Sequence, residues 1–138
     1  KNECKYDVYL RSIYADEIKD NIKVAPGKKH QFDTPTPIES AIVKASKSDD
    51  QKDPAQFEWS IKDGKLFYDI SLIDGDPFVD DGGEIFKVKK GKKCNRQPLK
   101  CKKGDKKCKD AYYNPDDRQT WTCTDSFDSF EVVSCKSN

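Results

Sequence analysis

The chain has 138 residues, enough for one domain, with 34% apolar residues, 37% charged residues and a net charge of +1. Its single histidine, His30, excludes the two-histidine chemistry of ribonucleases, and with no Cys-x-x-Cys pair present it also argues against a zinc site. No stretch approaches the ~20 apolar residues that a membrane-spanning helix needs.

The six cysteines predict a disulfide framework and therefore an oxidising compartment. The chain begins with a lysine rather than a methionine, which fits a mature secreted protein whose signal peptide has been removed. We expect an extracellular monomer that needs neither a cofactor nor a metal. The cysteines are Cys4, Cys94, Cys101, Cys108, Cys123 and Cys135.

Hydrophobicity alternates with a period of two through most of the chain, and turn sequences rich in Pro, Gly and Asp interrupt the alternation. Many short strands separated by turns predict an all-β sandwich or barrel. No segment of useful length has the 3.6-residue period of an amphipathic helix. Strands are predicted over residues 5–14, 21–24, 38–45, 56–61, 66–72, 84–88, 119–124 and 129–135.

A tight hairpin is predicted around Asp63-Gly64, the dipeptide that favours a two-residue type I′ turn. This turn places Glu58 directly opposite Asp69, with their Cβ atoms roughly 5 Å apart. Phe67 shares their face. The opposite face is apolar and consists of Phe57, Trp59, Ile61, Leu66, Tyr68, Ile70 and Leu72.

Opposed carboxylates destabilise a sheet unless a raised pKa, a nearby cation or a ligand compensates. Asp74 and Asp76 add two more acids just after the second strand. Two interpretations of this face stay open. It is either a solvated surface on which the repulsion between the acids has no function, or a cleft that binds polar ligands. An EF-hand over residues 74–85 is rejected because Val79 stands where the loop glycine is required.

Residues 87–109 carry twelve Lys or Arg against one acid, Asp105, and residues 89–118 have almost no aliphatic side chains. We interpret residues 87–118 as a basic loop outside the sandwich, stapled by cysteines. It keeps the protein soluble, docks on the protein's own acidic face or binds a polyanion, and because it has few interleaved aromatic residues we expect no nucleic acid partner. The candidate polyanion-binding residues are Lys100, Lys102, Lys103, Lys106 and Lys107.

FYDISLIDG (67–75) closely resembles the FYDVSLVDGFN signature of thaumatin-like proteins, and FEW (57–59) resembles the glutamate-bearing strand that precedes it. NECKYDVYL followed by VAPGKK resembles the opening of that superfamily. Length and ending are most similar to the yeast-phase-specific (Bys) family, which are small secreted fungal thaumatin-like proteins. The shared segments, which leave out residues 87–118, are Phe57–Trp59, Tyr68–Ser71, Gly75–Phe78, Cys123–Asp125 and Cys135.

The resemblance implies a thaumatin-like β-sandwich of one domain over residues 1–138, with disulfides Cys4–Cys135 and Cys94–Cys123 and, by exclusion, Cys101–Cys108. It also implies an acidic cleft linked to β-1,3-glucan, whose carboxylates match Glu58, Asp69 and Asp74. Two features depart from the larger thaumatin-like proteins. Their second domain is absent, and their cleft arginine has no clear match here, with Arg11 and Arg96 as unaligned candidates.

The leading hypothesis is a non-catalytic fungal effector or cell-wall protein that binds β-glucan or a related carbohydrate. The candidate ligand-binding residues are Glu58, Phe67, Asp69, Asp74 and Asp76. One alternative is a protein-binding module, either an inhibitor of a secreted hydrolase or an effector that binds a secreted host protein through the lysines. The other is a weak endo-β-1,3-glucanase, a glycoside hydrolase with Glu58 and Asp69 as acid and base.

Overall fold

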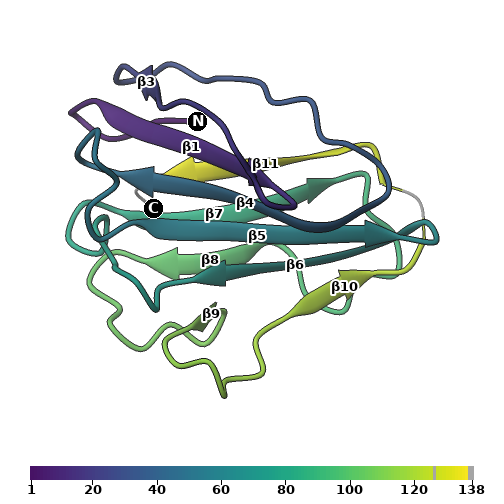
Figure 1. Ribbon diagram of the computed structural model, residues 1–138. Helices are drawn as coiled ribbons and strands as arrows, with labels where there is room; N and C mark the ends of the chain where they lie inside the picture. Colours follow the sequence, from purple (N-terminus) through teal and green to yellow (C-terminus); the bar gives the residue numbers. More distant parts are fainter. Residues whose placement is uncertain (126, 137–138) are drawn as a thin grey trace.

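The computed structural model describes residues 1–125 and 127–136, and over these residues the protein consists of strands and loops (Figure 1). No helix in these two ranges could cross a bilayer. The eight predicted strands are all present, and three short strands, β2, β8 and β9, were not predicted. The strands are β1 (Val8–Tyr14), β2 (Glu17–Ile18), β3 (Ile22–Val24), β4 (Ile38–Ser46), β5 (Ala55–Lys62), β6 (Lys65–Ser71), β7 (Gly83–Lys89), β8 (Leu99–Lys102), β9 (Ala111–Tyr112), β10 (Trp121–Cys123) and β11 (Ser129–Ser134).

Two sheets of unequal size pack face to face, as Figure 1 shows. The large sheet has the order β10-β6-β5-β4-β1-β2, with β3 also pairing with β1 and β9 with β6. The small sheet has the order β11-β7-β8. The predicted all-β sandwich is therefore confirmed.

The β5–β6 hairpin has the predicted register. Asp63 and Gly64 both have positive φ, 53° and 74°, as a type I′ turn requires. Trp59 opposes Tyr68, and Glu58 opposes Asp69. Because side chains alternate along a strand, this register directs the apolar residues of both strands towards the small sheet and the two acids to the outer face.

The core lies between the sheets and is rich in aromatic residues. Tyr68 and Phe86 are fully buried, and their ring centroids are 5.2 Å apart. Trp59 contacts Phe130 of β11 edge to face, with centroids 4.9 Å apart. These ring contacts join the large sheet to the small one, and aromatic pairs of this kind contribute about 0.5–1.5 kcal/mol each beyond the area they bury.

Three disulfides constrain the chain, in the pairs that the family resemblance implies: Cys4–Cys135, Cys94–Cys123 and Cys101–Cys108. Cys4 and Cys135 are 131 residues apart in sequence. In the chain-entropy model, a crosslink that closes such a long loop stabilises the fold by about 4–5 kcal/mol.

The basic segment is more than a loop. Leu99 is fully buried in β8, which pairs with β7 of the small sheet, and Ala111 is buried in β9, which lies parallel to β6 of the large sheet. Low aliphatic content suggested an excursion that contributes nothing to the core. That expectation was wrong for these two strands, because one leucine and the disulfide Cys101–Cys108 supply enough buried apolar surface to hold the segment on the sandwich.

Candidate functional site

Glu58 and Asp69 form a pair of carboxyl groups on the outer face of the large sheet, where both side chains are half-buried. The pKa of Asp69 is raised to about 9, first because burial disfavours its charge, then because it hydrogen bonds to Glu58 and is repelled by the charge on Glu58. At neutral pH Asp69 therefore keeps its proton, which it shares with Glu58 through the hydrogen bond between them. A solvent-shielded oxygen, Asp69 Oδ1, has no hydrogen-bond partner among the described residues.

Aromatic rings lie on both sides of this pair along β6. Phe67 precedes Asp69 by two residues on the same face and is half-buried. On the other side, the register of β9 places Tyr112 next to Ser71, and the Tyr112 hydroxyl lies 2.5 Å from Thr120 Oγ1. The outer face therefore presents a proton-sharing acid pair between two ring-bearing positions.

The two acids that follow β6 lie in different places. Asp74 is exposed and accepts a hydrogen bond from Gln56 Nε2 at 2.9 Å, which connects it to the strand of Glu58. Asp76 instead hydrogen bonds to Glu84 of β7, whose side chain is 1% exposed. Only Asp74 of these two acids is thus joined to the outer-face pair.

The Asp76–Glu84 pair is a second site where carboxyl groups meet. Burial is the main cause that raises the pKa of Glu84 to about 9, and the nearby Asp76 charge adds to it. The pKa of Asp76 is also raised by burial. Glu84 lies on the same side of β7 as buried Phe86 and therefore faces the interior between the sheets, whereas Asp76 is half-buried.

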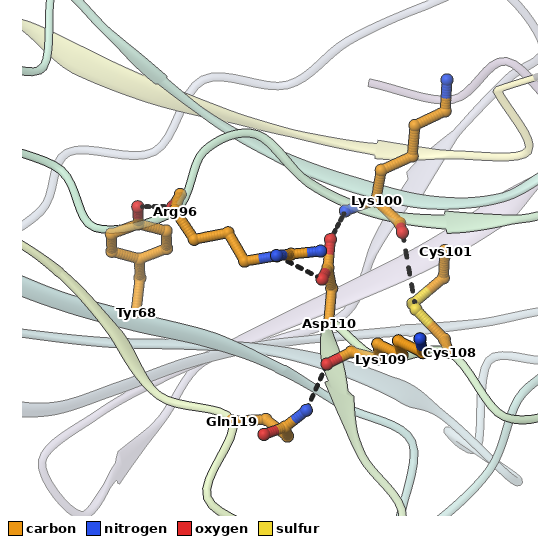
Figure 2. Close-up of polar contacts among 8 residues, drawn as sticks. All are labelled: Tyr68, Arg96, Lys100, Cys101, Cys108, Lys109, Asp110 and Gln119. Carbon is orange, nitrogen blue, oxygen red and sulfur yellow. Dashed lines mark hydrogen bonds and ion pairs between the residues drawn. A yellow bond between two sulfur atoms is a disulfide. The ribbon is translucent and has the colours of Figure 1, made fainter.

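The two arginines considered for a cleft lie in different environments. Arg11 lies in one row with Lys44 and Gln56 across β1, β4 and β5, on the face that carries Glu58. Figure 2 shows Arg96 in the basic segment, where its Nε lies 2.5 Å from Asp110 Oδ1. The Arg96 guanidinium also lies over Trp121, 5.4 Å from the ring centroid, and is therefore committed to the fold.

Asp110 fastens the basic segment to the sandwich. It is 5% exposed, and its Oδ2 accepts a hydrogen bond from the Lys100 backbone N–H at 3.0 Å (Figure 2). Tyr68 donates a hydrogen bond to the Arg96 carbonyl, so the core also binds this segment. A buried carboxylate with a guanidinium and a backbone N–H as partners holds a loop in one conformation.

The candidate polyanion-binding lysines surround this anchor at the surface. All of them are exposed except Lys100, which is half-buried. Within the described part of the chain, none of these five lysines forms an ion pair within 4.0 Å. Their charge is therefore available to a partner.

His30, the only histidine, lies far from the acids in sequence and packs edge to face against Phe32, with centroids 4.6 Å apart. Over residues 1–125 and 127–136, no group of three or more His, Cys, Asp or Glu side chains is arranged to hold a metal ion. The outer-face pair offers a hydrogen-bond donor and acceptors to a ligand.

Sequence reasoning missed Tyr112, Gln56 and Glu84. Gln56 could have been found, because it lies on the same strand face as Glu58 at a spacing of two residues. Tyr112 comes to the site through a two-residue strand in a basic segment, and no local pattern predicts such a strand. Glu84 alternates with Phe86 and Val88 on the apolar face of β7, and an acid in that series is the available signal.

Comparison with known proteins agrees with the fold. The family described as Blastomyces yeast-phase-specific protein matches residues 1–135. An antigenic thaumatin-like protein of Arthroderma benhamiae is 34% identical over 138 residues, covering 98% of this chain and 68% of the relative. The secreted thaumatin-like protein calA of Emericella nidulans is 28% identical over 130 residues, covering 91% and 73%.

Two solved structures are similar in fold. The protein elicitor MoHrip2 from Magnaporthe oryzae aligns with a TM-score of 0.80 and 22% identity, over 98% of this chain and 95% of that one. The thaumatin-like xylanase inhibitor TLXI aligns with a TM-score of 0.62 and 16% identity, over 99% and 97%. At these identities the likeness concerns the fold. With the family match over residues 1–135 and the two fungal relatives, it shows that the chain is a small thaumatin-like protein of the Blastomyces yeast-phase-specific (Bys) family.

Proposed function

We propose that the protein is extracellular and binds a neutral cell-wall carbohydrate, with β-glucan as the leading candidate, through the outer face of β5 and β6. The observation that carries this proposal is the Glu58–Asp69 pair, two opposed carboxyl groups that share a proton on a half-exposed face. Three disulfides and a relative named as secreted support the extracellular setting.

A shared proton suits a sugar ligand. One protonated and one ionised carboxyl group provide a donor and several acceptors side by side, which matches the hydroxyl groups of an uncharged sugar. Gln56 and Asp74 extend this set of polar groups, and the rings of Phe67 and Tyr112 provide apolar surface for a sugar face. Ionised polysaccharides gain less, because the pair still carries one negative charge.

The same geometry disfavours catalysis. A retaining glycosidase holds its two carboxyl groups ~5–5.5 Å apart on either side of the bond that it cleaves. Here the Asp69 and Glu58 carboxyl groups hydrogen bond to each other on one flat surface, so they do not flank a substrate. We therefore expect no release of reducing sugar from soluble β-1,3-glucan above the level of the Glu58→Gln variant.

Co-sedimentation with insoluble β-1,3-glucan tests the proposal. The wild-type protein should sediment with the glucan, and the double variant Glu58→Gln, Asp69→Asn should bind at least tenfold more weakly, because it loses the shared proton and replaces two acceptor oxygens by NH₂ donors. Asp16→Asn, Glu17→Gln is the matched control, since both residues are exposed and lie at the β2 edge of the large sheet, which β1 and β4 separate from β5. Equal sedimentation of all three proteins, or none by the wild type, would contradict carbohydrate binding at this site.

A second candidate function is binding of a secreted protein. The unpaired lysines of the basic segment favour it, because a cluster of exposed like charges steers association with an acidic partner. The structural neighbour TLXI is named as a xylanase inhibitor, which makes a secreted hydrolase a reasonable partner class to examine.

The two candidates respond to different substitutions. If the second candidate is correct, replacing Lys102, Lys103, Lys106 and Lys107 by Ser should abolish capture of an acidic hydrolase. The same replacement should leave sedimentation with glucan unchanged, because the lysines lie outside the outer-face pair. Capture should also weaken as the salt concentration rises. If the Ser variant captures the same proteins as the wild type at low salt, the lysines are not the binding surface.

A further inference from the structure

The two sheets differ in size, and the difference leaves part of the core face without a strand to cover it. The small sheet has three strands, whereas the large sheet continues past β4 to β1 and β2. Residues 28–37, between β3 and β4, cover that region instead, and Figure 1 shows this connection in dark blue, running along the upper and right-hand side of the molecule. The connection contains no strand or helix and offers a single large apolar side chain, Phe32.

A pocket of about 490 Å³ lies between this connection, the inner face of the large sheet and β11. Its size lies within the range of sites for small molecules, about 300–1,000 Å³. It is on the opposite side of the large sheet from Glu58 and Asp69, which lie on the outer face. The apolar floor comes from three strands of the large sheet and comprises Leu10, Val43, Trp59 and Ile61.

Aromatic side chains line much of this pocket. Trp59 and Phe130 form the edge-to-face pair that joins the two sheets, and His30 and Phe32 form another in the covering connection. Phe127 lines the pocket beside β11. Rings from three directions around one space provide both faces and edges to a planar guest, and aromatic groups prefer such offset or edge contacts.

The charged side chains around the pocket balance one another, and the α-ammonium group of Lys1 already donates a hydrogen bond to the Val132 carbonyl at 2.7 Å. The described lining includes three lysines and three acids: Lys1, Lys29, Lys89, Asp33, Asp128 and Glu131. Lys89 and Glu131 lie 3.9 Å apart and neutralise each other. A charged ligand would therefore lose hydration without gaining a net opposite charge, whereas hydroxyl or carbonyl groups could hydrogen bond at the rim.

We propose that this pocket binds an uncharged aromatic molecule that carries hydroxyl or carbonyl groups, a phenol-like compound. The apolar floor and the aromatic walls hold the ring, and the polar rim formed by Gln31, Thr34 and Ser129 holds the oxygen atoms. The site is independent of the outer-face acids, so one molecule of the protein binds both ligands at once.

Isothermal titration at pH 6 with three probes tests the proposal: 1-naphthol, which is aromatic and uncharged; 1-naphthoate, which is aromatic and charged; and 1-decanol, which is apolar without a ring. We expect saturable binding of 1-naphthol, at least tenfold tighter than that of either other probe. Equal affinity for 1-naphthoate would overturn the preference for an uncharged ligand, and equal affinity for 1-decanol would overturn the aromatic preference. Absence of saturable 1-naphthol binding would overturn the site itself.

Two variants locate the binding. Ser129→Trp and Gln31→Trp each place a large ring at an exposed position of the lining, on β11 and on the covering connection respectively. Either one should weaken 1-naphthol binding at least tenfold, and having two guards against misfolding of one, which circular dichroism would detect. Asp116→Trp adds the same ring at an exposed turn outside the pocket and should bind as the wild type does. Unchanged affinity in both folded pocket variants would place the ligand elsewhere.

Discussion

Two pairs of carboxyl groups, with the same chemistry, lie in contrasting parts of this molecule. Glu58 and Asp69 meet across neighbouring strands on the outer face, half-exposed. Asp76 and Glu84 meet between a loop and β7, and Glu84 is 1% exposed on the core face. In each pair, burial and the neighbouring acid raise a pKa to about 9, so each pair holds a proton at neutral pH.

The contrast shows that a raised pKa does not by itself identify a binding site. The outer pair is only half-buried and has rings beside it, so a ligand can reach it. Glu84 of the inner pair shares its side of β7 with Phe86 and Val88. There the bound proton prevents two neighbouring carboxylates from repelling each other and destabilising the fold. Substitutions at the two pairs should therefore separate binding from stability.

The largest expected effect comes from truncating the buried acid. Glu84→Ala removes a fully enclosed side chain and leaves Asp76 without its hydrogen-bond partner, so the free energy of unfolding should fall by about 2–4 kcal/mol. Glu58→Ala, on the half-exposed face, should change it by less than about 1 kcal/mol. Urea denaturation at pH 5 measures both, and similar losses in the two variants would remove the distinction between the pairs.

Asp110 extends the comparison to a buried acid that has a cation as its partner. Asp110→Ala leaves the Arg96 guanidinium and the Lys100 N–H without their acceptor, so unfolding should become about 1–3 kcal/mol easier. The basic segment should also become more sensitive to proteolysis, since Asp110 fastens it to the sandwich. Asp110→Asn keeps the shape and should lose less; a loss as large as that of Ala would mean that charge, not hydrogen bonding, dominates.

The dependence of stability on pH follows from both pairs. The folded pKa values of Asp69 and Glu84, about 9, lie above their ordinary values of 3.8 and 4.5, so the folded protein binds more protons than the unfolded chain between these limits. Stability should therefore be greatest near pH 4 and fall as pH rises towards 9, by at most about 1.4 kcal/mol per pH unit for each pair.

Denaturation at pH 5 and pH 8 measures this slope. Glu84→Gln should flatten it and stabilise the protein at pH 8, because the glutamine needs no proton to remain buried. Asp69→Asn should flatten it separately, since the two pairs lie on opposite sides of the large sheet and their effects should add. A wild-type protein as stable at pH 8 as at pH 5 would show that neither pair holds its proton.

The smallest expected effect on stability belongs to the variant with the largest effect on binding. Glu58→Gln, Asp69→Asn keeps the size of both side chains on a half-exposed face, so at pH 4, where protonating Asp69 costs little, the unfolding free energy should change by no more than about 0.5 kcal/mol. Sedimentation with glucan is nevertheless expected to be lost. If binding and stability fell together, the outer pair would be a structural feature like the inner one.

Local sequence predicts the β5–β6 hairpin and its faces because Asp63-Gly64 adopts the positive φ values that a type I′ turn needs. That turn determines the register, and the register alone brings Glu58 opposite Asp69. The alternation of apolar residues likewise predicts eight of the strands. Each of these features depends on residues close together in the chain.

The contacts between distant segments were decided only by the tertiary structure. Asp76 meets Glu84 rather than the outer acids because the chain turns away after β6 and packs Phe78 into the core. The two-residue strand β9 is held by pairing with β6, not by any pattern of its own, and it brings Tyr112 to the site. The pocket exists because the two sheets differ in width. The physical reason is the same for the Asp76–Glu84 contact, strand β9 and the pocket. A turn determines the pairing of the two strands that it joins, whereas long-range contacts depend on how the whole chain buries its apolar surface.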